Sequence, residues 1–160
     1  MFWVIHILLG MVIGLEFHSA WLIIPIAFLS HFILDYIPHW DGFFDKELFR
    51  ETGIARITKR DVIIKTIDFT FMVLVTILFY YMYITGGSTI DKSNLLLGAF
   101  MALLPDFIKI GYLTRLKKRK TYHKYLHFHS KIQRDITWKK GLITQSILLV
   151  ILLLYLNHLV

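Results

Sequence analysis

Two histidines and two aspartates lie close together in residues 30–41, where a long apolar run ends. His31 and Asp35 have the i, i+4 spacing that places two side chains on one face of a helix. Pro38 disfavours a helical conformation at the residue before it, so we expect the helix to end there and His39 and Asp41 to lie on the following turn. Imidazole nitrogens and carboxylate oxygens are ligands of zinc-like divalent ions. This stretch therefore predicts part of a metal site.

Two further aspartates fall inside apolar runs. An ionised aspartate within a membrane span costs about 2.5–3.5 kcal/mol, so such a residue normally faces a partner or water. Asp106 follows Pro105, and Asp68 lies near the start of its run. A simple ion pair is the alternative for each, with Lys109 for Asp106 and Lys65 for Asp68.

The segment 115–140 is strongly basic and contains His123, His127 and His129. In an extended segment His127 and His129 would share a face, whereas in a helix His123 and His127 would. Either arrangement could add one or two metal ligands. The alternative is a solvated basic segment that binds anionic lipid headgroups. His6, in the first apolar run, is expected to be a helix-packing residue.

The composition indicates an integral membrane protein. Of the 160 residues 56% are hydrophobic, and the mean hydropathy is +0.60, whereas soluble domains are about 45–50% apolar. The absence of cysteine excludes disulfides, thiolate ligands and a cysteine nucleophile. The net charge of +7 fits lysines and arginines in cytoplasmic loops beside anionic lipid, so no nucleic-acid partner is expected.

The apolar runs predict an all-α fold, a polytopic membrane helical bundle of about five transmembrane helices that forms one domain over residues 1–160. The first two runs are short for spanning, and they form either a tight helical hairpin or a re-entrant pair. Gly10 and Gly14 have the spacing that allows another helix to approach closely. A short amphipathic helix is expected within 46–57. The expected spans cover 1–15, 20–37, 61–85, 94–113 and 141–159.

The loops after the second and fourth spans hold most of the lysines and arginines outside the spans. The positive-inside rule places both loops in the cytoplasm, with the N-terminus inside and the C-terminus outside. This topology brings the ionisable side chains of several separate segments to the inner leaflet, which supports a common site there.

Short motifs resemble those of the small bacterial membrane-bound, metal-dependent hydrolases. Ser30, His31, Asp35 and Pro38 match a Ser-His-x-x-x-Asp helix end followed by proline, and 104–106 match a Leu-Pro-Asp motif. His6 is similar to an early histidine of the family, and 129–130 to a loop His-Ser pair. In the family, the Leu-Pro-Asp and His-Ser motifs precede the Ser-His-x-x-x-Asp helix, whereas here they follow it. The resemblance implies a metal centre of His31, Asp35, Asp106 and a loop histidine that hydrolyses a phosphoester.

We therefore expect a membrane-bound metal-dependent hydrolase that acts on a phosphorylated lipid or similar amphiphile at the cytoplasmic leaflet. Zinc is the expected ion, and Asp41 or Asp68 the expected general base. The segment 115–140 is expected to bind anionic headgroups. The expected metal ligands are His31, Asp35, His39 and Asp106, completed by His127 or His129.

A non-catalytic membrane protein is the alternative. It would be a metal-ion carrier, or a scaffold in which the polar cluster only holds helices together. A carrier should have polar residues through the outer half of its spans, and this chain offers little there beyond Glu16 and His18.

Overall fold

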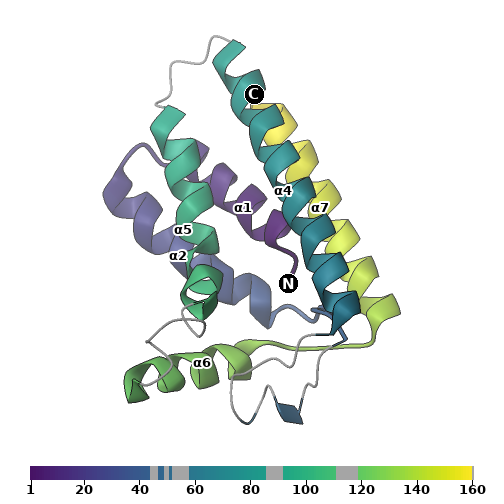
Figure 1. Ribbon diagram of the computed structural model, residues 1–160. Helices are drawn as coiled ribbons and strands as arrows, with labels where there is room; N and C mark the ends of the chain where they lie inside the picture. Colours follow the sequence, from purple (N-terminus) through teal and green to yellow (C-terminus); the bar gives the residue numbers. More distant parts are fainter. Residues whose placement is uncertain (44–46, 49–50, 52–57, 86–91, 111–118, 160) are drawn as a thin grey trace.

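The computed structural model describes residues 1–43, 47–48, 51, 58–85, 92–110 and 119–159. Within these ranges the chain forms helices and no strand (Figure 1). The all-α prediction is thus confirmed, and most of the amphipathic segment expected within 46–57 lies outside the described residues. The helices are α1 (Trp3–Glu16), α2 (Ala20–Tyr36), α4 (Lys59–Thr85), α5 (Lys92–Ile110), α6 (Lys120–Ile132) and α7 (Trp138–Leu159).

The prediction of about five transmembrane helices is wrong. Among the described residues, only α4 and α7 are long and apolar enough to cross a membrane. The 14 residues of α1 and 17 of α2 give lengths of about 21 and 26 Å, against a hydrocarbon core of about 30 Å. α5 contains three charged residues, Lys92, Asp106 and Lys109, and charged residues are costly within a membrane span. The expected basic loop also needs correction, because α6 occupies half of it.

α1 is the central helix of the fold and packs against α2, α4, α5 and α7. Most of its residues are buried, on every side of the helix. It meets α5 at glycines: a Cβ on Gly10 would lie 2.4 Å from the Gly98 carbonyl oxygen, and one on Gly14 would lie 2.2 Å from the Asn94 oxygen. These distances confirm the close approach predicted from the glycine spacing.

Asp68 attaches α4 to the beginning of α1. Its Oδ2 accepts a hydrogen bond from the Trp3 N–H at 2.7 Å, and its Oδ1 accepts one from the Val4 N–H at 3.2 Å. The first N–H groups of a helix have no partner within the helix, and a carboxylate also interacts favourably with the positive end of the helix dipole. Asp68 therefore stabilises the start of the helix that carries His6.

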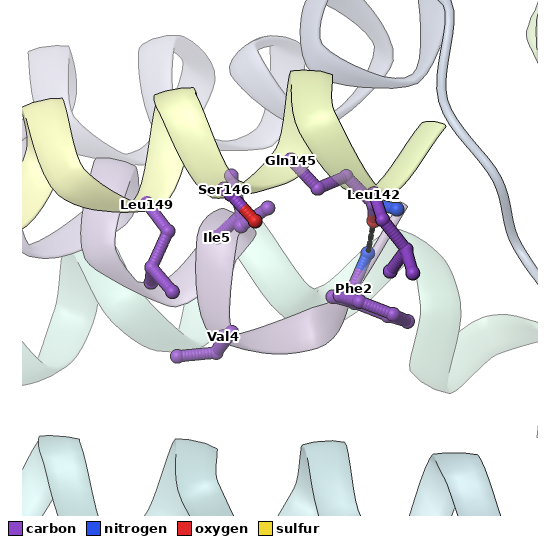
Figure 2. A pocket seen from close by; sticks show the side chains of 7 residues that line it. All are labelled: Phe2, Val4, Ile5, Leu142, Gln145, Ser146 and Leu149. Carbon is purple, nitrogen blue, oxygen red and sulfur yellow. Dashed lines mark hydrogen bonds between the residues drawn. The ribbon is translucent and has the colours of Figure 1, made fainter. Parts of the chain in front are cut away.

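Gln145 attaches α7 to the same end of α1, as Figure 2 shows. Its Oε1 accepts the Phe2 N–H at 3.0 Å, and its Nε2 donates to the Trp40 carbonyl at 2.9 Å. A small, mainly apolar pocket lies between α1 and α7 beyond this bond. It is lined by Phe2, Val4, Ile5, Leu142, Gln145, Ser146 and Leu149.

α6 runs crosswise to α4 in Figure 1, near the end at which α4 and α7 begin. The segment after α6 returns to the end of α2. The Arg134 N–H donates to the Asp35 carbonyl at 3.3 Å, the His39 N–H to the Arg134 carbonyl at 3.0 Å, and the Ile136 N–H to the His39 carbonyl at 3.0 Å. These bonds hold the C-terminal end of α6 against the His31–Asp35 turn of α2.

The outer surface of the helices is apolar. Large hydrophobic side chains are exposed along α2, α4, α5 and α7, including Trp21, Ile33, Ile67, Leu74, Phe100, Ile147 and Leu154. The inside of the molecule holds an unusual number of ionisable groups, which are buried around the ends of α2 and α5. Soluble proteins have the opposite distribution.

Candidate metal centre

Asp35 lies at the centre of a group of three buried histidines from three helices. The Nε2 atom of His129, on α6, is 2.9 Å from Asp35 Oδ2, and that of His31, on α2, is 3.4 Å from the same oxygen. The Nε2 atom of His6, on α1, is 3.3 Å from Asp35 Oδ1. Each of these side chains is at most 1% exposed. One carboxylate is therefore shared by imidazoles that lie far apart in the sequence.

Asp106, at the end of α5, completes this arrangement. Its Oδ1 is 3.6 Å from His31 Nε2 and 3.9 Å from His129 Nε2, and the two Nε2 atoms are 3.2 Å apart. Two overlapping groups in the described chain could hold a metal ion: His6, His31 and Asp35, and His31, Asp106 and His129. We call these five residues the His–Asp cluster.

The separations between these atoms suit a metal ion. Around a tetrahedral ion with bonds of about 2.0–2.1 Å, neighbouring ligand atoms lie about 3.3 Å apart. The distances of 3.2 Å between His31 and His129 and 3.4 Å between His31 and Asp35 are close to that value. A single ion could therefore bind these groups with small side-chain adjustments.

The hydrogen bond at Nδ1 of His31 leaves Nε2 as the nitrogen that can bind a metal. Its Nδ1–H donates to the Ala102 carbonyl at 2.8 Å, so in the neutral ring Nε2 carries the lone pair. Fixing the tautomer through the second nitrogen is the usual arrangement of a metal-ligating histidine. The His6 ring stacks on that of His31, with centroids 4.0 Å apart. Sequential helices α1 and α2 thus present two Nε2 atoms to one aspartate.

Several buried polar atoms of the cluster have no hydrogen-bond partner. They are both ring nitrogens of His6 and Oδ1 of Asp106, and Oε1 of the neighbouring Gln133 is a further case. Buried polar groups are nearly always paired, so each exception calls for a physical explanation. A cation among His6, His31 and Asp35 would supply the missing partner for a His6 nitrogen, whereas Asp106 Oδ1 has the Lys109 ammonium 2.6 Å away.

His129 is held by a tyrosine from its own helix. The Tyr125 hydroxyl donates to the Pro105 carbonyl at 2.6 Å, and its oxygen lies 3.4 Å from His129 Nδ1. Burial, partly opposed by Asp35, lowers the pKa of His129 to about 4. The imidazole is therefore neutral at pH 7, and neutral imidazole is the form that binds metals.

Two lysines lie beside the cluster, each against a carboxylate. Lys65 Nζ is 2.6 Å from Asp41 Oδ1, and Lys109 Nζ is 2.6 Å from Asp106 Oδ1. Burial opposes ionisation of Asp41, but the Lys65 ammonium outweighs it, so the pKa of Asp41 is held well below its usual range. The Lys109 ammonium is close to Asp106 Oδ1 without the geometry of a hydrogen bond.

The structure brings four of the predicted ligands together: His31, Asp35, Asp106 and His129. His39 lies beside them, with its Nδ1–H donated to the Ile37 carbonyl at 2.7 Å and its Nε2 only 2.7 Å from the Met1 amino nitrogen. Its Nε2 is 3.9 Å from Asp35 Oδ1. Burial lowers the pKa of His39.

The remaining predicted residues occupy different positions. His127 is half-buried on α6, and its backbone carbonyl accepts a hydrogen bond from the Ser130 hydroxyl. Asp68 binds the N-terminal N–H groups of α1. Asp41 is adjacent to the cluster, since Gln133 Nε2 bridges Asp35 Oδ2 at 3.2 Å and Asp41 Oδ2 at 3.4 Å. The general-base role of Asp41 or Asp68 remains a prediction.

His6 and Gln133 are the residues that the sequence reasoning missed. His6 was expected to be a packing residue, and the signal for a different role was a lone imidazole in an otherwise apolar helix. Gln133 had no sequence signal, because its contact with Asp35 spans nearly one hundred residues. Comparisons with protein-family models, with curated proteins and with solved structures give no match to this chain.

Proposed function

We propose that the chain is a membrane-bound, metal-dependent hydrolase that cleaves a phosphoester of a lipid or similar amphiphile at the cytoplasmic leaflet. One observation carries the proposal: Nε2 atoms of three buried histidines and oxygens of two aspartates converge in one cluster. The motif resemblance to metal-dependent hydrolases involves the same residues, His31, Asp35, Asp106 and His129.

The ligand set fits a divalent ion, and zinc is our first choice because it prefers nitrogen and carboxylate ligands in a small shell. Such an ion, when bound, supplies Lewis acidity and activates water near neutral pH. Of the two predicted general bases, Asp41 lies nearer the cluster, because Gln133 links it to Asp35, and it would have to release Lys65 before it could accept a proton. Asp68 would act indirectly, by holding α1 and thus His6.

The apolar outer surface supports a location in the membrane. α4 and α7 could cross it, and the exposed hydrophobic side chains of α2 and α5 would face lipid or packed helices. α6 would lie at the interface, because it has basic residues on its exposed side and Tyr122, Leu126 and His129 on its buried side. Its lysines would contact anionic headgroups.

Metal content and hydrolysis test the function together. We expect purified wild-type protein to contain one bound transition ion and to release phosphate from a short-chain phosphatidic acid. His31→Ala should lose both properties, because it removes the nitrogen common to the two ligand groups. His127→Ala is the matched control on α6 and should retain both. Elemental analysis and a phosphate assay measure the outcome; equal metal content in all three proteins would refute the metal site.

The same experiment separates the alternative functions. A carrier would bind metal without hydrolysing the ester. A scaffold, whose charges are satisfied by the Lys65–Asp41 and Lys109–Asp106 pairs, would contain no metal in any variant. Metal together with metal-dependent phosphate release is expected only of the hydrolase.

We also propose that the N-terminus lies in the cytoplasm and the C-terminus outside, from the distribution of lysine and arginine. Crossings by α4 and α7 alone would leave both ends on one side, so this topology requires α5, which lies between them in the chain, to return across the membrane. A reporter enzyme that is active only in the periplasm should be active when fused to the C-terminus. The same reporter inserted between α6 and α7, within 133–137, should be inactive. A cytoplasmic signal from the C-terminal fusion would contradict this topology.

A further inference from the structure

Lys65 and Lys109 are partly exposed charged groups beside the buried cluster. Their side chains are 32% and 23% exposed, whereas the histidines of the cluster are 0% exposed and Asp35 is 1% exposed. The two lysines come from different helices, α4 and α5. Each interacts electrostatically with both Asp41 and Asp106, so the same two carboxylates lie near both ammonium groups.

The charge around the cluster changes sign when a divalent ion binds. Four buried carboxylates, Asp35, Asp41, Asp68 and Asp106, surround the two lysines and exceed their ammonium groups by two charges. The Met1 amino group, 3.0 Å from Asp35 Oδ1, adds to the positive side. With that amino group the balance is one negative charge, and a divalent ion would change it to one positive charge. A buried excess charge attracts a counter-ion, because little water is present to screen it.

The lysines have donors available for such a counter-ion. An ammonium group carries three N–H donors, and Lys65 uses one for its bond to Asp41 Oδ1. Lys109 Nζ is 2.6 Å from Asp106 Oδ1, and this contact occupies one of its three donors. Both side chains are long enough to pivot about their carboxylate partners. A tetrahedral oxyanion with two negative charges would satisfy several of these donors at once.

We propose that Lys65 and Lys109 form a phosphoryl-binding site at the edge of the His–Asp cluster, and that the substrate group is a phosphomonoester dianion. This inference rests on the proposed function, because the positive excess requires the bound ion. It narrows the substrate class from phosphoesters in general to monoesters, which carry more charge at neutral pH than diesters. It also gives the two lysines a binding role beyond their ion pairs.

Inorganic phosphate is the probe for this site. We expect metal-loaded wild-type protein in detergent to bind phosphate, measured by titration calorimetry, and metal-free protein to bind it much more weakly. Lys109→Met removes the cation beside Asp106, so its metal content is measured first; the metal-loaded variant should bind phosphate about 10-fold more weakly or worse, because a hydrogen bond to a charged group is lost. Lys139→Met, which removes an exposed lysine at the start of α7, is the matched control and should bind phosphate normally.

Lys65 needs a paired variant, because its removal alone would leave Asp41 buried without its cation. The double variant Asp41→Asn/Lys65→Met preserves the charge balance and should also lose phosphate affinity while retaining the metal. Lys65→Arg keeps the positive charge and should bind phosphate. Unchanged phosphate affinity in both Lys109→Met and the double variant would overturn the inference and leave the metal site intact. Absence of metal from the wild type would remove both proposals.

A lipid headgroup and a soluble phosphate ester offer the same chemistry to this site. Wild-type protein in nanodiscs of phosphatidylcholine should bind free phosphate as it does in detergent. Adding phosphatidic acid, whose headgroup is a phosphomonoester, should weaken free-phosphate binding by competition if the substrate is a lipid. Undiminished binding in the presence of phosphatidic acid would identify the ligand as a soluble monoester held at the same lysines.

Discussion

Asp35→Asn is expected to remove the bound ion from the protein. The side chain lies between His6, His31 and His129, and it is the one carboxylate within 3.5 Å of all three in the described structure. Loss of a hydrogen-bond partner outside the ligand shell already costs about 10–100-fold in metal affinity. Loss of the shared Asp35 carboxylate should lower the metal affinity by more than that factor. Elemental analysis and titration with zinc measure the effect.

Asp41→Asn is the matched comparison for this variant. It removes the same charge a few residues away, but Asp41 belongs to neither ligand group. We expect this variant to retain its metal, although Lys65 loses its ion-pair partner. Equal metal loss in the two variants would show that net charge, and not ligation by Asp35, controls binding.

Gly98→Ala is expected to destabilise the fold and to disrupt the metal centre at a distance. The added Cβ would lie 2.1 Å from the Gly10 carbonyl oxygen and 3.0 Å from the Gly14 nitrogen, both of them backbone atoms of α1. Backbone cannot rotate away as a side chain can, so α1 and α5 must separate. Inserting extra volume into a packed interior costs about 1–3 kcal/mol in the free energy of unfolding. Thermal unfolding in detergent measures the loss.

The metal content of Gly98→Ala tests the link between helix packing and the cluster. α1 carries His6 and α5 carries Asp106, so their separation should move the two ligands apart. Phe100→Ala changes an exposed residue of α5 and should alter neither the metal content nor the melting temperature appreciably. A Gly98→Ala protein with normal stability and metal content would contradict the proposed rigid contact.

The local features of the site could be predicted from the sequence. His31 and Asp35 share a helix face because helical periodicity relates i and i+4 whatever surrounds the helix. Pro38 likewise limits the helix, and α2 ends at Tyr36. The apolar runs correspond to five of the helices, since continuous hydrophobic residues must be buried or placed in lipid.

The choice among histidines depended on the tertiary structure. His127 and His129 were equivalent candidates in the sequence, and α6 turns His129 toward Asp35 because the chain after it pairs with the end of α2. In the sequence Asp68 was a candidate catalytic residue, but in the structure its carboxylate accepts hydrogen bonds from the N–H groups at the beginning of α1. The positions of His129 and Asp68 cannot be predicted from residue spacing in the sequence, because each depends on a contact between distant segments.

What the sequence determined by itself was the helical class, the apolar surface and the His31–Asp35 pair, all of which depend on neighbouring residues in the chain. The tertiary structure decided that His6 joins the cluster, that Gln133 bridges two aspartates, and that only α4 and α7 have the length and composition of spans. Those features depend on the packing of α1 against α5 and on the path of the chain after α6. Such long-range contacts leave no periodic signal in a single sequence.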